Sequence, residues 1–356
     1  MRTITRGVVL LTTVIAVGVA AAAAAASAPP VAPSDTKLLG QRIMVGFDGL
    51  QASPSLLSAV RQGRIGSVIL FAYNIGSRAQ LRALTGSLQN AARSGGNPPV
   101  LIAIDQEGGQ IKRLASGPPY LSPPQMTSTG NPTAAFNQGR ATASYLKGLG
   151  VNWDLAPVLD VPTFGGAFIW QEGRAFSFNA TRVATYGTQF ALGLQRNRAA
   201  ATGKHFPGVG TAGVDTDFLL DRLFPGPITW GNALLPYKTL IPRGLDSVML
   251  STAAYPAHDA SGTPAALSVP IIQGLLRGRL HFQGVAITDA LFSPTGYDEA
   301  TAGRVAARAG ADVLLYTDSA PGVLDGLQSD LKSGRLSRGG ALASYRRIVA
   351  LKRKVG

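Results

Sequence analysis

Short apolar runs alternate with longer amphipathic stretches from residue 37 to the C-terminus. Runs such as SVILF at 67–71 are almost continuously apolar, which is typical of strands buried on both faces of a parallel sheet. Apolar positions at helical spacing fill the gaps, for example at 78–92, 134–149 and 181–194. The pattern predicts eight strands, at 42–47, 67–71, 100–104, 151–156, 200–204, 247–251, 284–288 and 311–316.

Eight strand–helix units in succession predict an α/β fold, a (β/α)8 TIM-type barrel that forms one domain over residues 37–356. The length would also allow two domains, but single barrels of about 250 residues or more are common. A doubly wound open sheet has the same alternation and is the alternative. We disfavour it because it calls for a Gly-rich phosphate loop after the first strand, which GFDG at 46–49 matches poorly.

Residues 1–28 have the pattern of an export signal. Arg2 and Arg6 precede an apolar run at 8–26, and small residues follow at 26–28. We therefore expect a signal peptide, with the protein exported to the periplasm, the cell wall or the medium. Because the run is close to the length that spans a bilayer, an uncleaved N-terminal anchor is the alternative. The Pro-rich segment 29–36 is expected to be a linker.

The charge balance narrows the set of partners. The chain has 33 Lys and Arg against 19 Asp and Glu, a formal net charge of +14, and these cations are scattered singly apart from the last few residues. No nucleic-acid-binding signature is present, so we expect no nucleic-acid partner, whereas electrostatic association with anionic cell-wall polymers is plausible for an exported protein. The chain has no Cys, and its acidic residues lack metal-ligand spacing. We expect no metal and no cofactor.

Polar residues follow three of the predicted strands directly. Asp105 follows LIAI, Lys204 and His205 end the fifth strand, and Asp289 follows VAIT. In a barrel of this type the chemistry takes place where the strands end at the carboxyl face. An isolated Asp at a strand end is commonly a helix cap or turn residue, but several at corresponding positions predict a site.

The motifs around these residues resemble those of glycoside hydrolase family 3, in particular its single-domain β-N-acetylglucosaminidases. The resemblance runs in order along almost the whole chain after the linker. The matching segments are GQRIMVG (40–46), VILF (68–71) followed by NI (74–75), DQEGG (105–109), APVLD (156–160), GRAF (173–176), GKHFPG (203–208) and ITDAL (287–291).

The resemblance implies a role for each matching residue. Asp289 falls on the family's nucleophile, a carboxylate that can form a glycosyl-enzyme ester. The residues that fall on those binding the terminal, nonreducing sugar are Asp105, Arg113, Arg174, Lys204 and His205. Three of these residues also have a structural alternative: Asp289 could cap a helix, Asp105 could be a turn residue, and His205 could pack in the core.

One departure from the family concerns the general acid and base. The resembling enzymes carry a His at the end of the loop after KHFPG, and this chain ends the corresponding segment with Asp215, Thr216 and Asp217. We hypothesise that Asp217, with Asp215 beside it, takes the proton-transfer role, since neighbouring like charges raise the pKa of one of them. Two alternatives are that the loop has lost its acid and that both residues lie in a solvated turn. His258 and His281 lie outside this loop, and no motif supports either.

Together these features predict an exported retaining β-glycoside hydrolase with its nucleophile at Asp289. The resemblance favours terminal β-N-acetylglucosamine, or a related β-hexoside, from cell-wall or chitin-type oligosaccharides as the substrate. The alternative function is a protein that binds a sugar or wall fragment without hydrolysing it. The sequence leaves hydrolysis and phosphorolysis undistinguished.

Overall fold

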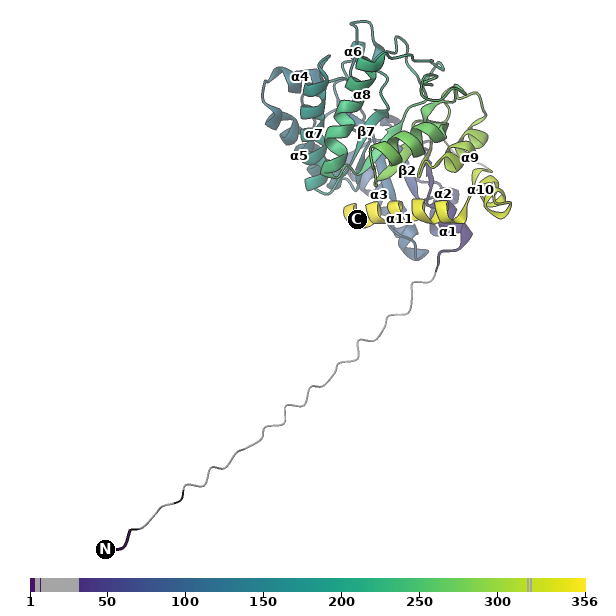
Figure 1. Ribbon diagram of the computed structural model, residues 1–356. Coiled ribbons are helices and arrows are strands. Elements are labelled where there is room, and N and C mark those ends of the chain that lie inside the picture. Colours follow the sequence, from purple (N-terminus) through teal and green to yellow (C-terminus); the bar gives the residue numbers. More distant parts are fainter. Residues whose placement is uncertain (4–6, 8–31, 319, 321) are drawn as a thin grey trace. The chain divides into compact units, whose positions relative to one another are not determined.

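The computed structural model describes residues 1–3, 7, 32–318, 320 and 322–356. By its contacts the chain divides into two units, Met1–Ala32 and Pro33–Gly356, and all described helices and strands belong to the second (Figure 1). Most of the expected signal peptide or anchor at 1–28 lies outside the described residues. No helix within the described ranges has the length and apolar character to cross a membrane.

Eight parallel strands form the sheet, and its first strand pairs with its last. Parallel pairing joins β1 to β10, and a bridge between Ile287 and Val313 joins the two ends of the strand order β10-β1-β2-β3-β6-β7-β8-β9. The predicted barrel is therefore confirmed, and the open doubly wound sheet is wrong. The strands are β1 (Ile43–Val45), β2 (Ser67–Leu70), β3 (Leu101–Ile104), β6 (Trp153–Asp154), β7 (Ala200–Phe206), β8 (Ser247–Leu250), β9 (Val285–Thr288) and β10 (Leu314–Tyr316).

Helices surround this barrel, and a two-stranded ribbon extends from its carboxyl end. The three helical segments named from the sequence correspond to α3, α5 and α7. The ribbon consists of β4 (Gln106–Gly108) and β5 (Ile111–Lys112). The α-helices are α1 (Asp35–Gly40), α2 (Pro54–Arg61), α3 (Arg78–Ser94), α4 (Pro123–Ser128), α5 (Pro132–Lys147), α6 (Phe168–Gln171), α7 (Ala180–Arg196), α8 (Pro227–Leu240), α9 (Glu299–Ala309), α10 (Val323–Lys332) and α11 (Arg338–Val355). Shorter helical segments are η1 (Ala72–Asn74), η2 (Ile241–Arg243), η3 (Ala265–Leu267) and η4 (Pro270–Arg279).

Local sequence signals set where these helices begin. Ser77 caps α3, because its hydroxyl accepts the N–H of Gln80 at 3.1 Å while the Gln80 side chain accepts the N–H of Ser77 at 3.4 Å. Such a reciprocal cap satisfies two of the N–H groups that a helix start leaves without partners. Helix α1 begins at Asp35, inside the segment expected to be a linker.

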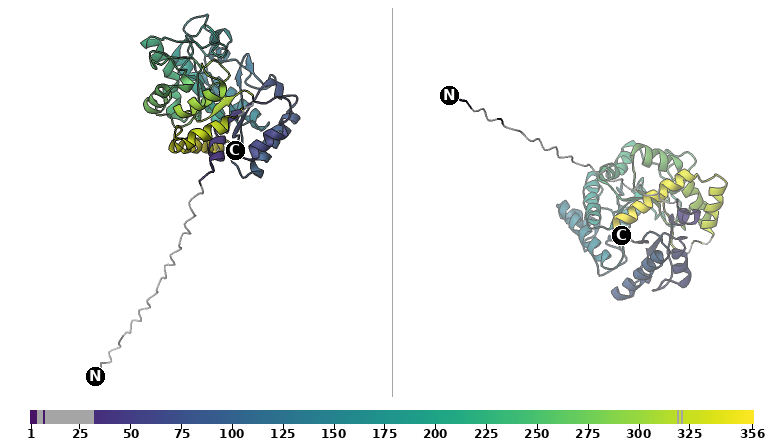
Figure 2. Two further views of the ribbon diagram at one scale, coloured as in Figure 1. Left: turned by 90° about the vertical axis from the view of Figure 1, so that its right-hand side faces the viewer. Right: turned by 90° about the horizontal axis from the view of Figure 1, so that it is seen from below.

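Two apolar layers hold the barrel together. One lies between the strands and the surrounding helices, and the other fills the barrel interior with side chains such as Met44, Leu101 and Trp153. Helix α11 lies across the end of the barrel where the strands begin (Figure 2). Its residues Ile348 and Leu351 belong to the interior cluster. This end of the barrel is therefore covered, and a ligand reaches the interior only from the carboxyl ends of the strands.

The same helix places a lysine in the covered end. Lys352 is 1% exposed, and its ammonium group donates to Gln41 Oε1 at 2.6 Å and to the Gly66 carbonyl at 2.7 Å. Burial lowers the pKa of Lys352 to about 7. In the unfolded chain this pKa returns to about 10.4, so between these values the unfolded chain holds a proton that the folded chain has lost.

We expect the free energy of unfolding of the parent, relative to the Lys352→Met variant, to rise as the pH is raised from 7 to 10. The gain amounts to at most about 4 kcal/mol, since each pKa unit contributes about 1.4 kcal/mol. Below pH 7 the difference should be constant, because Lys352 is then protonated in both states. Urea unfolding of both proteins at several pH values measures it, and a difference that does not change with pH would contradict the lowered pKa.

Candidate active site

A pocket of about 250 Å³ opens at the carboxyl end of the barrel. A larger hollow of about 390 Å³ lies beside α2, but its lining is mainly apolar or uncharged. The carboxyl-end pocket instead gathers charged side chains from loops far apart in the sequence. It is lined by all eight residues predicted as catalytic or sugar-binding: Asp105, Arg113, Arg174, Lys204, His205, Asp215, Asp217 and Asp289.

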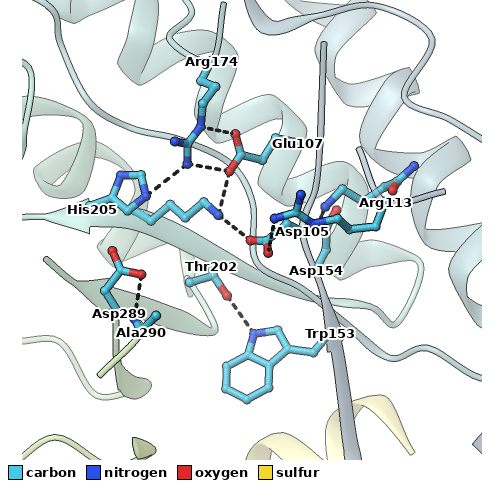
Figure 3. Close-up of polar contacts among 12 residues, drawn as sticks. Asp105, Glu107, Arg113, Trp153, Asp154, Arg174, Thr202, His205, Asp289 and Ala290 are labelled. Carbon is cyan, nitrogen blue, oxygen red and sulfur yellow. Dashed lines mark hydrogen bonds and ion pairs between the residues drawn. The ribbon is translucent and has the colours of Figure 1, made fainter. Parts of the chain in front are cut away.

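Glu107 connects two cations of this pocket, Arg174 and Lys204, and no role was predicted for it from its motif. Its carboxylate receives two bonds from Arg174, at 2.8 Å from Nε and 2.9 Å from Nη2, and lies 2.7 Å from Lys204 Nζ (Figure 3). Burial alone would raise the pKa of Glu107, but the charges of Arg174 and Lys204 lower it to about 2. Its place two residues after Asp105 was the available signal. Only the fold brings it against Arg174.

Asp105 lies at the end of β3 between Lys204 and a further cation, Arg113. Its Oδ1 accepts from Lys204 Nζ at 2.7 Å, and its Oδ2 lies 3.5 Å from Arg113 Nη2. Burial opposes ionisation of Asp105, but Lys204 and Arg113 hold its pKa below the ordinary value. Lys204 is itself buried, and the two carboxylates around it raise its pKa. These groups therefore stay charged and provide a fixed pattern of donors and acceptors for sugar hydroxyls.

His205 lies beside Lys204 and faces the same pocket. Regular alternation along a strand would place the two side chains on opposite faces, but the register between β7 and β8 shifts between Gly203 and Phe206. His205 Nδ1 lies 2.7 Å from Asp160 Oδ2, and Nε2 lies 3.3 Å from Arg174 Nη2. Burial lowers the pKa of His205, but the nearby Asp160 carboxylate raises it by more, so the pKa lies above the ordinary value. Asp160 ends the APVLD motif, and its contact with His205 was not foreseen.

Asp289 follows β9 and is 9% exposed. Its main-chain N–H donates to the Leu250 carbonyl at 2.8 Å, and its Oδ1 accepts the N–H of Ala290 at 2.9 Å. The strand end and this local bond fix the carboxylate at the pocket wall. No lysine or arginine forms an ion pair with it among the residues that the structure describes.

The loop after β7 brings Asp217 into the same pocket. Thr252 Oγ1 donates to the Thr216 carbonyl at 3.0 Å, and Ser293 Oγ lies 3.3 Å from Asp217 Oδ1. Asp215 accepts the N–H of Asp217 at 2.9 Å. Burial, together with the charges of Asp289 and Asp215, raises the pKa of Asp217 to about 7. A carboxyl group with this pKa can hold a proton near neutral pH and give it up.

The two remaining histidines line no part of this pocket. His258 stacks on Trp230 with ring centroids 3.6 Å apart, and burial lowers the pKa of His258. His281 precedes β9, at the opposite end of the barrel. Across the described ranges, no group of three or more His, Asp or Glu side chains is arranged to hold a metal ion.

The fold and the pocket define a barrel protein that holds several carboxylates and their cationic partners around one small polar cavity. Comparison with known proteins then identifies the family. Residues 36–351 match the model of the glycosyl hydrolase family 3 N terminal domain. The chain therefore belongs to glycoside hydrolase family 3 and is a glycosidase.

Individual relatives agree with this membership. An "Uncharacterized secreted glycosyl hydrolase" of Arthroderma benhamiae is 34% identical over 343 residues, which are 92% of this chain and 96% of that protein. A "Beta-hexosaminidase" of Xanthomonas oryzae pv. oryzae is 35% identical over 291 residues, or 77% of this chain and 82% of that protein.

Solved structures show the same fold. A family 3 β-N-acetylglucosaminidase from a Paenibacillus species superposes with a TM-score of 0.85 at 33% identity, covering 91% of this chain. This chain spans 63% of that longer protein. A β-N-acetylhexosaminidase from Beutenbergia cavernae superposes with a TM-score of 0.82 at 27% identity, with 90% of this chain and 99% of that one covered.

Replacing Glu107 by glutamine should lower kcat/KM on an aryl glycoside by about 100-fold, because Arg174 and Lys204 lose the charge that holds them together. Glu172→Gln is the matched control. Glu172 also pairs with Arg174, at 3.0 Å, but its side chain is 31% exposed, so we expect less than about a tenfold loss. Thermal unfolding of both variants separates lost positioning from lost folding. Equal losses in the two variants would contradict the role given to Glu107.

Proposed function

We propose that this glycosidase is a retaining β-N-acetylhexosaminidase that uses Asp289 as its nucleophile and Asp217 as its general acid and base. The observation that carries the proposal is that both carboxylates line one pocket, where burial and the neighbouring charges raise the pKa of Asp217 to about 7. Two carboxyl groups held in different electrostatic surroundings can take the two roles that retention requires.

In the first step a carboxylate oxygen of Asp289 attacks the anomeric carbon, and the bond from that carbon to the leaving oxygen breaks. Asp217 gives its proton to the leaving oxygen, so the aglycone departs as a neutral alcohol. The positive charge that develops on the ring is stabilised by the nearby carboxylates. The product of this step is a glycosyl ester on Asp289, with Asp217 ionised.

In the second step Asp217 takes a proton from water, and the water oxygen attacks the anomeric carbon. The ester bond to Asp289 breaks, which restores its carboxylate and completes retention. Asp215 positions Asp217 through the Asp217 N–H, and its charge helps to raise the pKa of Asp217. The other charged residues predicted for the pocket are proposed to bind the terminal sugar: Asp105, Arg113, Arg174, Lys204 and His205.

We propose terminal β-linked N-acetylglucosamine, or a related β-hexoside of cell-wall or chitin-type oligosaccharides, as the substrate. The names of the Xanthomonas and Paenibacillus relatives support this choice. The pocket volume of about 250 Å³ lies below the roughly 300–1,000 Å³ typical of larger ligands, which suits a single sugar ring. We also propose export, with 1–28 as signal peptide or anchor, a connecting segment from 29 that ends before α1 begins at Asp35, and the rest of the chain as the catalytic domain. The name of the Arthroderma relative supports export.

A panel of aryl β-glycosides tests the proposal. We expect fastest hydrolysis of the β-N-acetylglucosaminide, with the β-anomer of the sugar appearing first by NMR. Initial release of the α-anomer would contradict retention. Release of a sugar 1-phosphate in phosphate buffer would instead assign phosphorolysis. If no glycoside were cleaved while a sugar still bound, the protein would be a sugar-binding member of its family.

A further inference from the structure

Exposed cations gather at the end of the barrel opposite to the pocket. The helices of a (β/α)8 barrel run back against the strands, so their C-termini lie together at the end where the strands begin. Many helices in this chain carry an exposed Arg or Lys in the last turn there. We call the surface formed by six of these exposed side chains the basal face: Arg61 of α2, Arg93 of α3, Lys147 of α5, Arg196 of α7, Lys332 of α10 and Arg353 of α11.

These six cations carry uncompensated charge. None of them forms an ion pair with any residue in the described part of the chain. Four acidic residues lie at this end: Asp35, Asp246, Asp312 and Asp330. Each forms an ion pair with an Arg or Lys that is not one of the six basal cations. Apart from Asp154 inside the barrel, the other Asp and Glu residues follow the strands and lie toward the pocket end. The net positive charge is therefore concentrated on the basal face.

We propose that the basal face docks electrostatically on an anionic lipid bilayer. The cations come from the ends of six separate helices, α2, α3, α5, α7, α10 and α11, so a planar surface can meet them together. A single polymer chain would need a continuous groove or track of cations, and the basal cations are instead spread over separate helix ends. Lys and Arg near a surface of anionic headgroups are attracted by its negative potential.

The position of helix α1 agrees with this partner. Asp35 of α1 pairs with Arg338 of α11, the helix that lies across the same end, so the described barrel unit begins at the basal face. The pocket opens at the other end of the barrel. Docking would therefore hold the pocket mouth away from the lipid and toward soluble substrate. This inference is independent of the reaction proposed above.

Vesicle binding of the full chain tests the docking. We compare phosphatidylcholine vesicles with vesicles that also contain about 30% phosphatidylglycerol, since only the latter carry the negative potential. Binding to neutral vesicles measures any contribution of the apolar N-terminal run. We expect added anionic lipid to increase binding strongly, and salt raised from about 0.05 M to 0.5 M to remove the increase.

A variant with Arg61→Gln, Arg93→Gln and Arg353→Gln should lose about 100-fold in the part of binding that depends on anionic lipid. Its matched control carries three substitutions of exposed arginines away from the basal face and should lose less than about threefold, although its net charge falls equally. These control substitutions are Arg140→Gln, Arg182→Gln and Arg222→Gln.

Three outcomes would overturn the docking proposal. The first is equal loss in the two variants, which would assign the binding to net charge alone. The second is no gain of binding from anionic lipid. The third is complete release from vesicles by soluble polyphosphate at equal phosphate concentration, which would make an anionic polymer the preferred partner. Activity on aryl glycosides, measured in parallel, should be the same for the parent and both variants.

Discussion

Asp289→Asn is expected to lower kcat/KM by about 10⁴-fold or more, for every leaving group. The amide keeps the size of the carboxylate and can still accept the N–H of Ala290, so the fold should be retained. It cannot form an ester with the anomeric carbon, and the first step is lost. Steady-state kinetics on an aryl glycoside measures the effect, with circular dichroism as the check on folding.

Two further measurements make this prediction specific. The smaller Asp289→Ala side chain should let added azide react in its place, giving an α-glycosyl azide that NMR identifies. Asp298→Asn is the matched control, because Asp298 caps α9 in the same connection, and Asn caps helices equally well. An Asp289→Asn enzyme with more than about a tenth of parental activity would remove Asp289 from the nucleophile role.

Asp217→Asn is expected to lower kcat/KM by about 10² to 10⁴-fold on a disaccharide, whose leaving oxygen needs a proton. On an aryl glycoside with a strongly acidic phenol, formation of the ester should be nearly unchanged. Because the acid must be protonated, kcat/KM of the parent should fall as the pH rises through about 7, the pKa of Asp217. This alkaline fall should be absent in the variant.

The neighbouring acid Asp221 provides the control for this second prediction. It lies on the same loop, four residues beyond Asp217, but does not line the pocket. Asp221→Asn should therefore keep both the parental rate and the alkaline fall near pH 7. Two results would assign proton donation to another residue. One is an equal loss of kcat/KM for the Asp217→Asn variant on both kinds of substrate, and the other is a variant whose kcat/KM still falls as the pH rises through about 7.

The sequence predicted the barrel because burial on both faces makes each strand a short, nearly continuous apolar run. All eight predicted strands are present, with ends that differ by up to three residues, for example Leu314–Tyr316 where 311–316 was expected. The site residues at strand ends followed from the same reasoning. Asp105 and Asp289 come directly after apolar runs, and the carboxyl ends of parallel strands meet at one end of a barrel.

Other features of the site depend on contacts that no local pattern encodes. Regular alternation along β7 would separate Lys204 from His205, yet both line the pocket, at the point where the register against β8 shifts. The raised pKa of Asp217 arises from its burial and from Asp289, which follows a different strand. A segment with the same local sequence in a solvated turn would have an ordinary carboxyl group.

By itself the sequence determined the order of the elements, the alternation that makes a parallel barrel, and which charged side chains follow its strands. The tertiary structure alone decided which of these charges meet. Glu107 and Arg174 are 67 residues apart, Asp105 and Lys204 are 99 apart, and Asp217 and Ser293 are 76 apart. Electrostatic interactions act over a few ångströms of space, whatever the separation along the chain. Roles that depend on such pairs become visible only once barrel closure brings the strand ends together.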